Sequence, residues 1–340
     1  MKALVYTGSR QVQVRDVPIP EPEEGYVRIR VRYCGVCGSD VSIYMGMHLR
    51  AQAPLVLGHE IIGYVDKKNT DKGDYEIGDR VALWPNIPCE ECLFCKSGTP
   101  HVCKNLRIIG IDRDGGMAEY VICRWDRIYK LDPSVSDRAA AVVEPLAVGV
   151  RSVHQADFRT LSTATVIGAG PIGFTTAIML KAAGASRIII SDHSEERLKR
   201  CRELGFEAVN ASQTTVSNYV MEQTDGNGTD YVFECSGSAK GMLEMSIACK
   251  IGGTICLVSV PKQLREVNLR DVNFREQTIR GSRGHTQAEF QQAVQYLPAV
   301  QKDLEKTVSQ IIPLEQADGV FDLLADPDTM TIKVLIDCMK

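Results

Sequence analysis

TATVIGAGPIGFTTAIMLKAAGA, residues 163–185, joins an apolar strand to an apolar helix through a glycine-rich turn. The turn, Gly168-Ala-Gly170-Pro-Ile-Gly173, is a G-x-G-x-x-G sequence in the strand–turn–helix context that makes such a match a useful sign of dinucleotide binding. Gly168 permits the tight turn, Gly170 lets the backbone approach a pyrophosphate, and Gly173 allows close helix packing at a helix end that offers free N–H groups. We therefore expect cofactor contacts from Gly168, Gly170, Pro171, Ile172 and Gly173.

The rhythm of strand, turn and helix continues through the middle of the chain. Apolar runs recur at RIIISD (187–192), TDYVFECSG (229–237) and GGTICLVSV (252–260), and a helical run, SEERLKRCRELG (194–205), separates the first two. Alternation of this kind predicts an α/β fold with a doubly wound parallel sheet covered by helices on both faces.

The two ends of the chain have a different pattern. The first 150 residues contain runs with alternating apolar and polar positions, such as VRIRVRYCGV (27–36), and predict a β-rich domain. After about Arg275 the rhythm stops, and the closing run KVLIDC (333–338) could rejoin that first domain and make it discontinuous. A chain of 340 residues exceeds what one hydrophobic core usually supports, so two domains are expected.

Asp192 stands nineteen residues after Gly173, at the end of the second strand of this rhythm. An acidic side chain at this place accepts hydrogen bonds from the adenosine ribose diol and repels a 2′-phosphate, which favours NAD over NADP. Arg197, which we count among the cofactor contacts, and His193 leave some room for NADP. Asp192 could also be the N-cap of the following helix, and the two roles are compatible.

Four cysteines in one short loop have the spacing C-x2-C-x2-C-x7-C. Cys-x-x-Cys turns bring successive thiolates to one point, as a tetrahedral zinc site requires. A disulfide cluster or buried apolar cysteines are the alternatives, and the polar, loop-like segment argues against both. Four protein ligands leave no open position, so the expected role is structural. The predicted ligands are Cys89, Cys92, Cys95 and Cys103.

The composition limits the class of partner. The net charge is −4 and no Lys/Arg run occurs, which argues against a nucleic-acid or anionic-membrane surface and favours a small-molecule partner. There is no apolar run of membrane-spanning or signal-peptide length, so we expect a cytoplasmic protein. The cysteines outside the four-cysteine loop are then mostly expected to be reduced core thiols.

Three further clusters carry groups that can bind zinc: Cys37 in CGSD, His59 and Glu60 in GHE, and Glu144 in EPLA. Each of them alone has an ordinary explanation, since a single Cys is usually a core residue, a single His structural and a Glu solvated. Their order along the chain changes that assessment.

This order resembles, across essentially the whole chain, the zinc-dependent medium-chain alcohol and polyol dehydrogenases. CGVCGSD, VLGHEIIG, the cysteine loop, the glycine turn and FECSG all match in sequence, and EPLA resembles the sorbitol and sugar-alcohol branch. The resemblance implies a discontinuous GroES-like catalytic domain and a Rossmann domain. We place the catalytic domain at residues 1–150 and 275–340, with the structural-zinc lobe at about 85–113, and the NAD-binding domain at 151–274.

The resemblance also implies two zinc ions per chain and NAD as cofactor. Cys37, His59 and either Glu60 or Glu144 would bind the catalytic zinc, the other glutamate holding a water. Asp40 would orient His59. Zinc would lower the pKa of the substrate hydroxyl, and Ser39 would take the proton, so that hydride can pass to the nicotinamide. The ordinary alternative for Ser39 is that it is a turn residue that caps the following segment.

One residue departs from the pattern of these relatives. Many of them place a proton-relaying histidine three residues after Ser39, where this chain has Ser42, so water or another group such as His48 must serve. Tyr44 and His48 lie where relatives shape the substrate pocket. Arg283 resembles an arginine that faces the nicotinamide, although a solvated arginine is an equal alternative.

The resulting hypothesis is a zinc-dependent oxidoreductase that passes hydride between NAD and a secondary alcohol of a polyol, sugar acid or cyclitol, giving the ketone. Within the family, the alternative is a simple secondary-alcohol or threonine-type dehydrogenase. A zinc-ribbon binding module is the alternative of another class, and a redox-sensing or structural protein is a third. A homodimer or homotetramer is expected, with pairing around GGTICLVSV.

Overall fold

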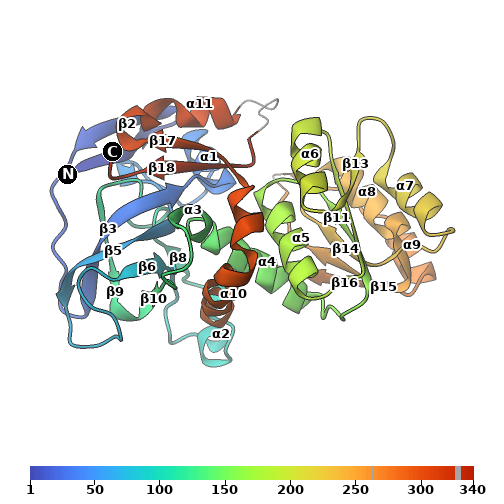
Figure 1. Cartoon of the computed structure of the whole chain (residues 1–340), viewed down its shortest axis with the longest axis horizontal. Coiled ribbons are helices and arrows are strands. Elements are labelled where there is room, and N and C mark those ends of the chain that lie inside the picture. The colour runs from blue at the N-terminus through green and yellow to red at the C-terminus, as the bar shows by residue number, and fades with distance from the viewer. Residues whose placement is uncertain (262, 326–330) are drawn as a thin grey trace. The chain divides into compact units, whose positions relative to one another are not determined.

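The computed structural model describes residues 1–261, 263–325 and 331–340, and it divides into two compact units. One unit combines Met1–Glu144 with Thr286–Lys340, and the other is Pro145–His285. Both termini therefore belong to the first unit (Figure 1). Within the described residues, none of the helices has both the length and the apolar character needed to cross a bilayer.

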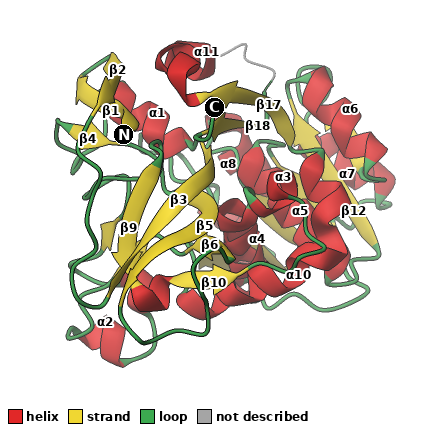
Figure 2. Ribbon diagram, turned by 60° about the vertical axis from the view of Figure 1, so that its left-hand side comes forward, coloured by secondary structure: helices red, strands yellow, loops and turns green. Residues whose placement is uncertain are grey.

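A seven-stranded sheet forms the centre of the first unit, in the order β10-β6-β5-β3-β18-β17, with β9 also paired to β3 (Figure 2). Apolar residues alternate with arginines along β3, and this pattern explains why the strand lies inside the sheet: Val27, Ile29 and Val31 point into the core, and the arginines between them are more exposed. The strands are β3 (Tyr26–Gly35), β5 (Glu60–Asn69), β6 (Arg80–Leu83), β9 (Tyr120–Arg124), β10 (Ile128–Lys130), β17 (Val308–Pro313) and β18 (Lys333–Asp337).

The closing strand β18 inserts beside β3 at the centre of that sheet. Leu335 pairs with Gly35 on one side of β3, and Gly35 pairs with Glu60 of β5 on the other. The first and last parts of the chain thus share one core, which agrees with the prediction that KVLIDC rejoins the first domain.

Smaller elements complete the first unit. Its other strands are β1 (Lys2–Gly8), β2 (Gln11–Asp16), β4 (Leu55–Val56), β7 (Asn86–Ile87) and β8 (Arg107–Ile108). Its helices are α1 (Gly38–Tyr44), α2 (Leu93–Lys96), α3 (Asp137–Ala140), α10 (Gln287–Glu305) and α11 (Val320–Ala325), with 3₁₀ turns at Pro100–Val102, Trp125–Arg127 and Leu314–Gly319. Helix α4 (Val143–Gln155) carries the chain into the second unit.

The second unit is a six-stranded sheet in the order β13-β12-β11-β14-β15-β16, in which every neighbouring pair is parallel. This confirms the predicted doubly wound α/β arrangement, because β11 has the earlier strands on one side and the later strands on the other. The strands are β11 (Thr163–Ile167), β12 (Arg187–Asp192), β13 (Glu207–Asn210), β14 (Thr229–Glu234), β15 (Cys249–Leu257) and β16 (Thr278–Gly281). The helices are α5 (Pro171–Ala182), α6 (Glu195–Glu203), α7 (Val216–Gln223), α8 (Ala239–Ala248) and α9 (Leu269–Phe274).

Candidate functional site

A thiol, an imidazole and a carboxylate meet in the first unit. Cys37 directly precedes α1, whereas His59 and Glu60 stand at the start of β5, and the ligand atoms of the three lie within 4.8 Å of one another. Gly58 makes this turn possible, since its φ is +95° and an added Cβ would lie 2.4 Å from the sulfur of Cys34. The GHE sequence is therefore a strand entry that aims two adjacent side chains at Cys37.

Asp40 lies behind the imidazole of His59. The Nδ1 of His59 is 3.6 Å from Oδ1 of Asp40, and both residues are buried. The other carboxylate oxygen of Asp40 accepts a hydrogen bond from the backbone N–H of Cys37, at 2.8 Å. Because Nδ1 faces Asp40, Nε2 is the nitrogen left for a metal.

Glu60 has a second neighbour that sequence reasoning missed. Lys333 of β18 donates to both carboxylate oxygens of Glu60, at 2.7 and 2.8 Å, and to the carbonyl of Val36 at 3.0 Å. Both side chains are 1% exposed. Burial alone would lower the pKa of Lys333, but the Glu60 carboxylate raises it overall, so the lysine is a cation. The sequence contained one sign of this contact, a single lysine in the largely apolar closing strand.

Glu144 and Ser39 also lie in the first unit. Glu144 stands in the first turn of α4, and its charge acts on Glu60, but its carboxylate does not belong to the compact group formed by Cys37, His59 and Glu60. Ser39 lies inside α1, after the N-cap residue Cys37, so the alternative that it caps this helix is wrong. Its hydroxyl oxygen is buried without a hydrogen-bond partner among the described residues.

These groups fit a zinc ion with one open position. A thiolate, an imidazole and a carboxylate form a donor set of the kind found in catalytic zinc sites with three protein ligands. The buried Oγ of Ser39 has no hydrogen-bond partner in the part of the chain that the structure describes, whereas Nδ1 of His59 and Oδ1 of Asp40 face each other at 3.6 Å. Buried polar atoms are normally paired, so the free hydroxyl of Ser39 indicates a site shaped for a further ligand.

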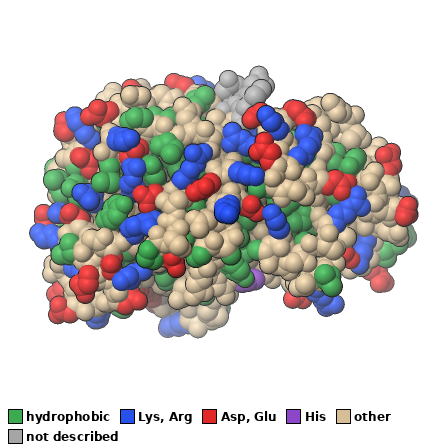
Figure 3. All heavy atoms as spheres, in the orientation of Figure 1, with side chains coloured by type: hydrophobic (Ala, Val, Ile, Leu, Met, Phe, Trp, Pro, Cys, Tyr) green, Lys and Arg blue, Asp and Glu red, His purple; other side chains and the backbone are tan. Residues whose placement is uncertain are grey.

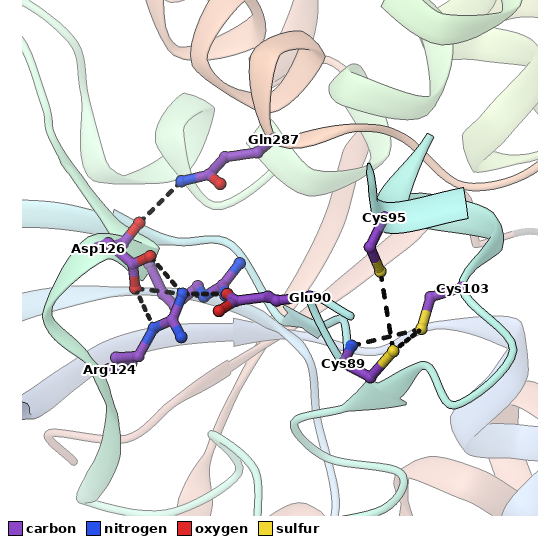
Figure 4. Close-up of polar contacts among 8 residues, drawn as sticks. Cys89, Glu90, Cys95, Cys103, Arg124, Asp126 and Gln287 are labelled. Carbon is purple, nitrogen blue, oxygen red and sulfur yellow. Dashed lines mark hydrogen bonds and ion pairs between the residues drawn. The ribbon is translucent and has the colours of Figure 1, made fainter. Parts of the chain in front are cut away.

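The four-cysteine loop forms a second compact donor set, and Figure 4 shows three of its members, Cys89, Cys95 and Cys103. Adjacent sulfurs are 3.4 Å (Cys103–Cys89), 3.6 Å (Cys92–Cys95), 3.8 Å (Cys92–Cys103) and 3.9 Å (Cys89–Cys95) apart. Thiolates at about 2.3 Å from a tetrahedral zinc lie about 3.8 Å from one another. All four are free thiols, so the disulfide alternative is wrong.

Two of these thiols have pKa values far from the ordinary one. Backbone N–H groups of Cys95 and Lys104 lower the pKa of Cys92 to about 6, so this sulfur is largely a thiolate at neutral pH. Burial, followed by the hydrogen bond with Cys92, raises the pKa of Cys95 to about 12. Metal binding at this loop therefore displaces protons.

An ion-pair network ties the loop to the rest of the first unit (Figure 4). Arg124 donates to Glu90, the residue after Cys89, and to Asp126 at 2.6 and 2.7 Å. Gln287, the first residue of α10, donates to the backbone carbonyl of Asp126 at 2.9 Å. The loop is thus anchored by charges as well as by its four sulfurs.

The glycine turn of the second unit has the predicted geometry. Gly168 has a φ of +100°, and a Cβ on Gly173 would lie 1.8 Å from the carbonyl oxygen of Gly168. Gly170 is the N-cap of α5, and a Cβ built there meets nothing within 4 Å. The first and third glycines are therefore required by packing, and the middle one borders open space at the start of a helix that begins with Pro171 and Ile172.

Asp192 is the last residue of β12 and is tied to that turn. One carboxylate oxygen accepts from the backbone N–H of Ala169 at 2.8 Å, and the other from that of Ser194 at 2.9 Å. Arg197 lies 3.6 Å away. Ser194, not Asp192, is the N-cap of α6, so the capping alternative is wrong for Asp192.

Two candidates for the substrate pocket, Tyr44 and His48, have definite surroundings. Tyr44 is buried, stacks on Phe321 with ring centroids 5.3 Å apart and donates to Asp322 at 2.6 Å, which makes it a packing residue. The Nδ1 of His48 accepts from two backbone N–H groups, at 3.2 and 3.3 Å. Burial and then the charge of Arg50 lower the pKa of His48, so this imidazole is neutral at pH 7.

The side chain of Arg283 is available to a ligand, whereas that of Ser42 is not. Arg283 is exposed just after β16, at the carboxyl end of the parallel sheet, and it has no side-chain partner among the described residues. Dinucleotides bind at this edge of such sheets. Ser42 donates to the carbonyl of Gly38 at 3.0 Å, one turn back in α1, and is thereby engaged within its own helix.

Two protein families match the chain. Residues 23–133 match the alcohol dehydrogenase GroES-like domain, and residues 171–299 match the zinc-binding dehydrogenase domain. The first match falls on the β-rich part that carries the two donor sets, and the second begins inside the glycine turn, at Pro171.

Curated relatives align over nearly the whole chain. A 2-dehydro-3-deoxy-L-galactonate 5-dehydrogenase of Pseudoalteromonas atlantica is 30% identical, and a sorbitol dehydrogenase of Halalkalibacterium halodurans is 31% identical, each with 99% of both chains covered. Among solved structures, one described as a zinc-binding dehydrogenase of Sinorhizobium meliloti bound to NADP is 30% identical, with a TM-score of 0.92 over 99% of this chain and 98% of that one.

Proposed function

Because this chain belongs to the zinc-dependent medium-chain alcohol and polyol dehydrogenases, we propose that it oxidises a secondary alcohol of a polyol, sugar acid or cyclitol to the ketone, with NAD as hydride acceptor. The chain is a zinc- and nicotinamide-dependent oxidoreductase. The observation that carries the proposal is the group of Cys37, His59 and Glu60, whose ligand atoms lie within 4.8 Å of one another beside an unpartnered buried hydroxyl.

The catalytic zinc would be held by Cys37, His59 and Glu60. When bound, zinc supplies Lewis acidity that lowers the pKa of a substrate hydroxyl. Asp40 holds His59 in the orientation that leaves Nε2 to the metal, and Lys333 holds Glu60 beside it. Glu144 acts on the same site through its charge and is the second carboxylate available there.

Ser39 is the group proposed to receive the substrate proton. Its Oγ has no hydrogen-bond partner among the described residues, so it is available to accept a hydrogen bond from a substrate hydroxyl. Onward transfer through Ser42 has no support, because that hydroxyl is engaged with Gly38. Since Nδ1 of His48 is also occupied, a relay through His48 would have to use Nε2.

NAD is proposed over NADP because of Asp192. Its carboxylate is fixed by Ala169 and Ser194 beside the glycine turn, where it would accept from a ribose diol and repel a 2′-phosphate. Arg197 is paired with Asp192 and so is not a free cation for that phosphate. Arg283 is proposed to contact the nicotinamide end, since its guanidinium is exposed at the carboxyl edge of the same sheet.

The four-cysteine loop is proposed to hold a structural zinc through Cys89, Cys92, Cys95 and Cys103.

We also propose a homo-oligomer and a cytoplasmic location; the twelve free thiols favour a reducing compartment. Strand β16 is the edge of the second sheet and lies next to β15 with its GGTICLVSV sequence, and we propose this end of the sheet as the place of pairing. Exposed apolar side chains gather after β15 and in the segment before β16, at Val260, Leu264 and Phe274.

A small-molecule substrate, rather than a nucleic acid or a membrane, is proposed as the partner. On the face shown in Figure 3, lysine and arginine side chains are mixed with aspartate and glutamate and form no continuous basic area. A surface of this kind lacks the clustered positive charge that phosphate backbones and anionic lipids select.

A substrate panel tests the proposed function. The zinc-loaded protein is incubated with NAD and, separately, with polyols, sugar acids, cyclitols, threonine and simple secondary alcohols, and formation of reduced nicotinamide is followed. We expect oxidation within the first three groups. Turnover of threonine or simple alcohols alone would establish the alternative within the family, and silence across the panel with two zinc ions bound would contradict the proposed activity.

A further inference from the structure

The first unit contains a large cavity that the proposed chemistry does not use. Its volume is about 1100 Å³, and its walls come from the segment around β4, from β8 and the residues that follow it up to Gly115, and from β9. None of the described ligands of the two donor sets lines it. Ligand pockets in proteins have volumes of about 300 to 1000 Å³, so this cavity has room for an organic molecule.

Much of the cavity wall is apolar. Val56 and Ile109 line it as part of the buried core. Val17, Ile87 and Ile122 also line it, and these three side chains are only partly buried. A ligand with an apolar body would remove such surface from water, which favours its binding in proportion to the area that it covers.

Five arginines and two aspartates are among the described residues that line the cavity. Three of the arginines already have acidic partners. Arg50 is paired with Asp112 at 3.2 Å, whereas Arg124 and Arg127 are paired with the carboxylates that anchor the four-cysteine loop. These three guanidinium groups therefore bring little free charge to the cavity.

The other two arginines, Arg107 and Arg113, are exposed and have no side-chain partner among the described residues. Arg107 lies in β8, and Arg113 forms an isolated bridge with Ile109, two residues further along the chain from Arg107. The second aspartate of the wall, Asp114, accepts a hydrogen bond from the backbone N–H of Val56 at 2.9 Å. The wall thus offers two free cations against one carboxylate that is already hydrogen-bonded.

We propose that this cavity binds an organic anion with an extended apolar body, whose carboxylate or phosphate head group is held by Arg107 and Arg113. Guanidinium groups match the geometry of both head groups, and the apolar wall accounts for the body. The chain as a whole has a net charge of −4, so its general composition does not explain free cations around an apolar cavity. The inference is independent of the proposed oxidation.

Binding of single-chain amphiphiles tests the proposal. Decanoate, decyl phosphate and the neutral decanol are titrated separately into the zinc-loaded full chain, and the heat of binding is measured. We expect saturable binding of at least one anion, with a dissociation constant at least about tenfold below that of decanol, because hydrogen bonds to a charged head group are the stronger ones. Decanol that binds as tightly as both anions, or no saturable binding of either anion, would overturn the proposal.

Replacing the two free arginines tests their role. Arg107→Gln/Arg113→Gln should weaken the binding of the anion about tenfold and leave that of decanol unchanged, whereas Arg107→Lys/Arg113→Lys keeps both charges and should retain most of the affinity. The matched control, Arg15→Gln/Arg30→Gln, removes two exposed arginines of the same unit that do not line the cavity, and it should bind like wild type. Equal weakening in the control would mean that only net charge matters, which contradicts the proposal.

Two other places in the chain could take up an anion, since a carboxylate can ligate zinc and a helix N-terminus can bind a phosphate. The titration is therefore repeated with Cys37→Ser and with wild type saturated with NADH. We expect the same dissociation constant in both. Loss of binding in either experiment would assign the anion to the catalytic zinc or to the cofactor turn and would overturn the proposal.

A decanoate analogue with a diazirine in its chain locates the site directly. After irradiation and digestion, mass spectrometry should find the label in peptides that contain β8 or β9. Label confined to peptides of the second unit would refute the assignment.

A second copy of this chain is the alternative occupant of the cavity. A subunit interface at this place would exclude small molecules, and the loss of two arginines from it would shift the oligomeric state. We expect light scattering to give the same mass for wild type and for Arg107→Gln/Arg113→Gln. A smaller species in the variant, together with no anion binding by wild type, would establish the interface and overturn the proposal.

Discussion

The Nδ1 of His59 lies 3.6 Å from Oδ1 of Asp40, and Asp40 is completely buried. A carboxylate behind a metal-binding imidazole fixes the ring and raises its basicity as a ligand. Asp40→Asn should therefore lower the affinity of the catalytic zinc about 10- to 100-fold. Dialysis against a chelator followed by metal analysis should leave one zinc per chain in the variant when wild type retains two.

The control for Asp40→Asn is Asp16→Asn, an exposed carboxylate of β2 whose described partner is Lys2. It should retain both zinc ions. Loss of the zinc of the four-cysteine loop from Asp40→Asn, with the catalytic zinc kept, would mean that Asp40 does not serve His59.

Asp192 should determine the choice of cofactor. Replacing it by alanine removes the charge that repels a 2′-phosphate and the acceptor for the ribose diol, so kcat/KM for NAD should fall about tenfold or more while that for NADP rises. Steady-state kinetics with both cofactors measure the ratio. Glu196→Gln, on the same helix as Arg197, is the matched control and should leave the ratio unchanged. A wild-type preference for NADP would refute the assignment.

The two zinc sites should fail in different ways. Cys95→Ser removes one of four structural ligands and should lower the melting temperature or disturb assembly while the remaining folded protein still turns over. Cys37→Ser should reduce kcat by at least about 100-fold with a melting temperature close to that of wild type. Thermal unfolding and activity are measured on both; the reverse pattern would mean that the two sites are assigned the wrong way round.

Acid should weaken the anchor of the four-cysteine loop. Burial alone would raise the pKa of Asp126, but Arg124 and Arg127 hold it below its ordinary value of 3.8. Stability from this carboxylate is therefore complete above the unfolded pKa and is lost as the pH falls through the lower folded pKa. Asp126→Asn should lower the free energy of unfolding by about 1 kcal/mol at pH 7, on the order of the loss of a hydrogen bond to a charged group. It should also flatten the decline of stability between about pH 5 and pH 3, because the variant has no carboxylate to protonate. Denaturant unfolding across that range measures it, and equal slopes for the two proteins would contradict it.

Local patterns allowed the parts of the site to be predicted. The glycine turn needs only the stretch between Gly168 and Gly173, where a positive φ and a close approach exclude side chains. The four-cysteine loop is equally local, because short turns bring its sulfurs together. Sequence therefore leads directly to a dinucleotide turn and a closed zinc site.

Contacts between distant strands could not be predicted in the same way. Lys333 and Glu60 are 273 residues apart and meet because β18 inserts beside β3 with one particular register. Tyr44 was expected at the substrate pocket, but stacking on Phe321 and the hydrogen bond to Asp322 place it in the packing of the first unit. The direction in which a side chain points depends on partners that one short sequence window does not contain.

Hydride transfer from substrate to nicotinamide tests the central claim most directly. A substrate found in the panel is prepared with deuterium on its secondary carbinol carbon and incubated with NAD and the zinc-loaded protein, and the reduced nicotinamide is analysed by mass spectrometry. The account predicts reduced NAD that carries the deuterium, formed by wild type and not by Cys37→Ser. Reduced nicotinamide without deuterium, or its equal formation by Cys37→Ser, would contradict it.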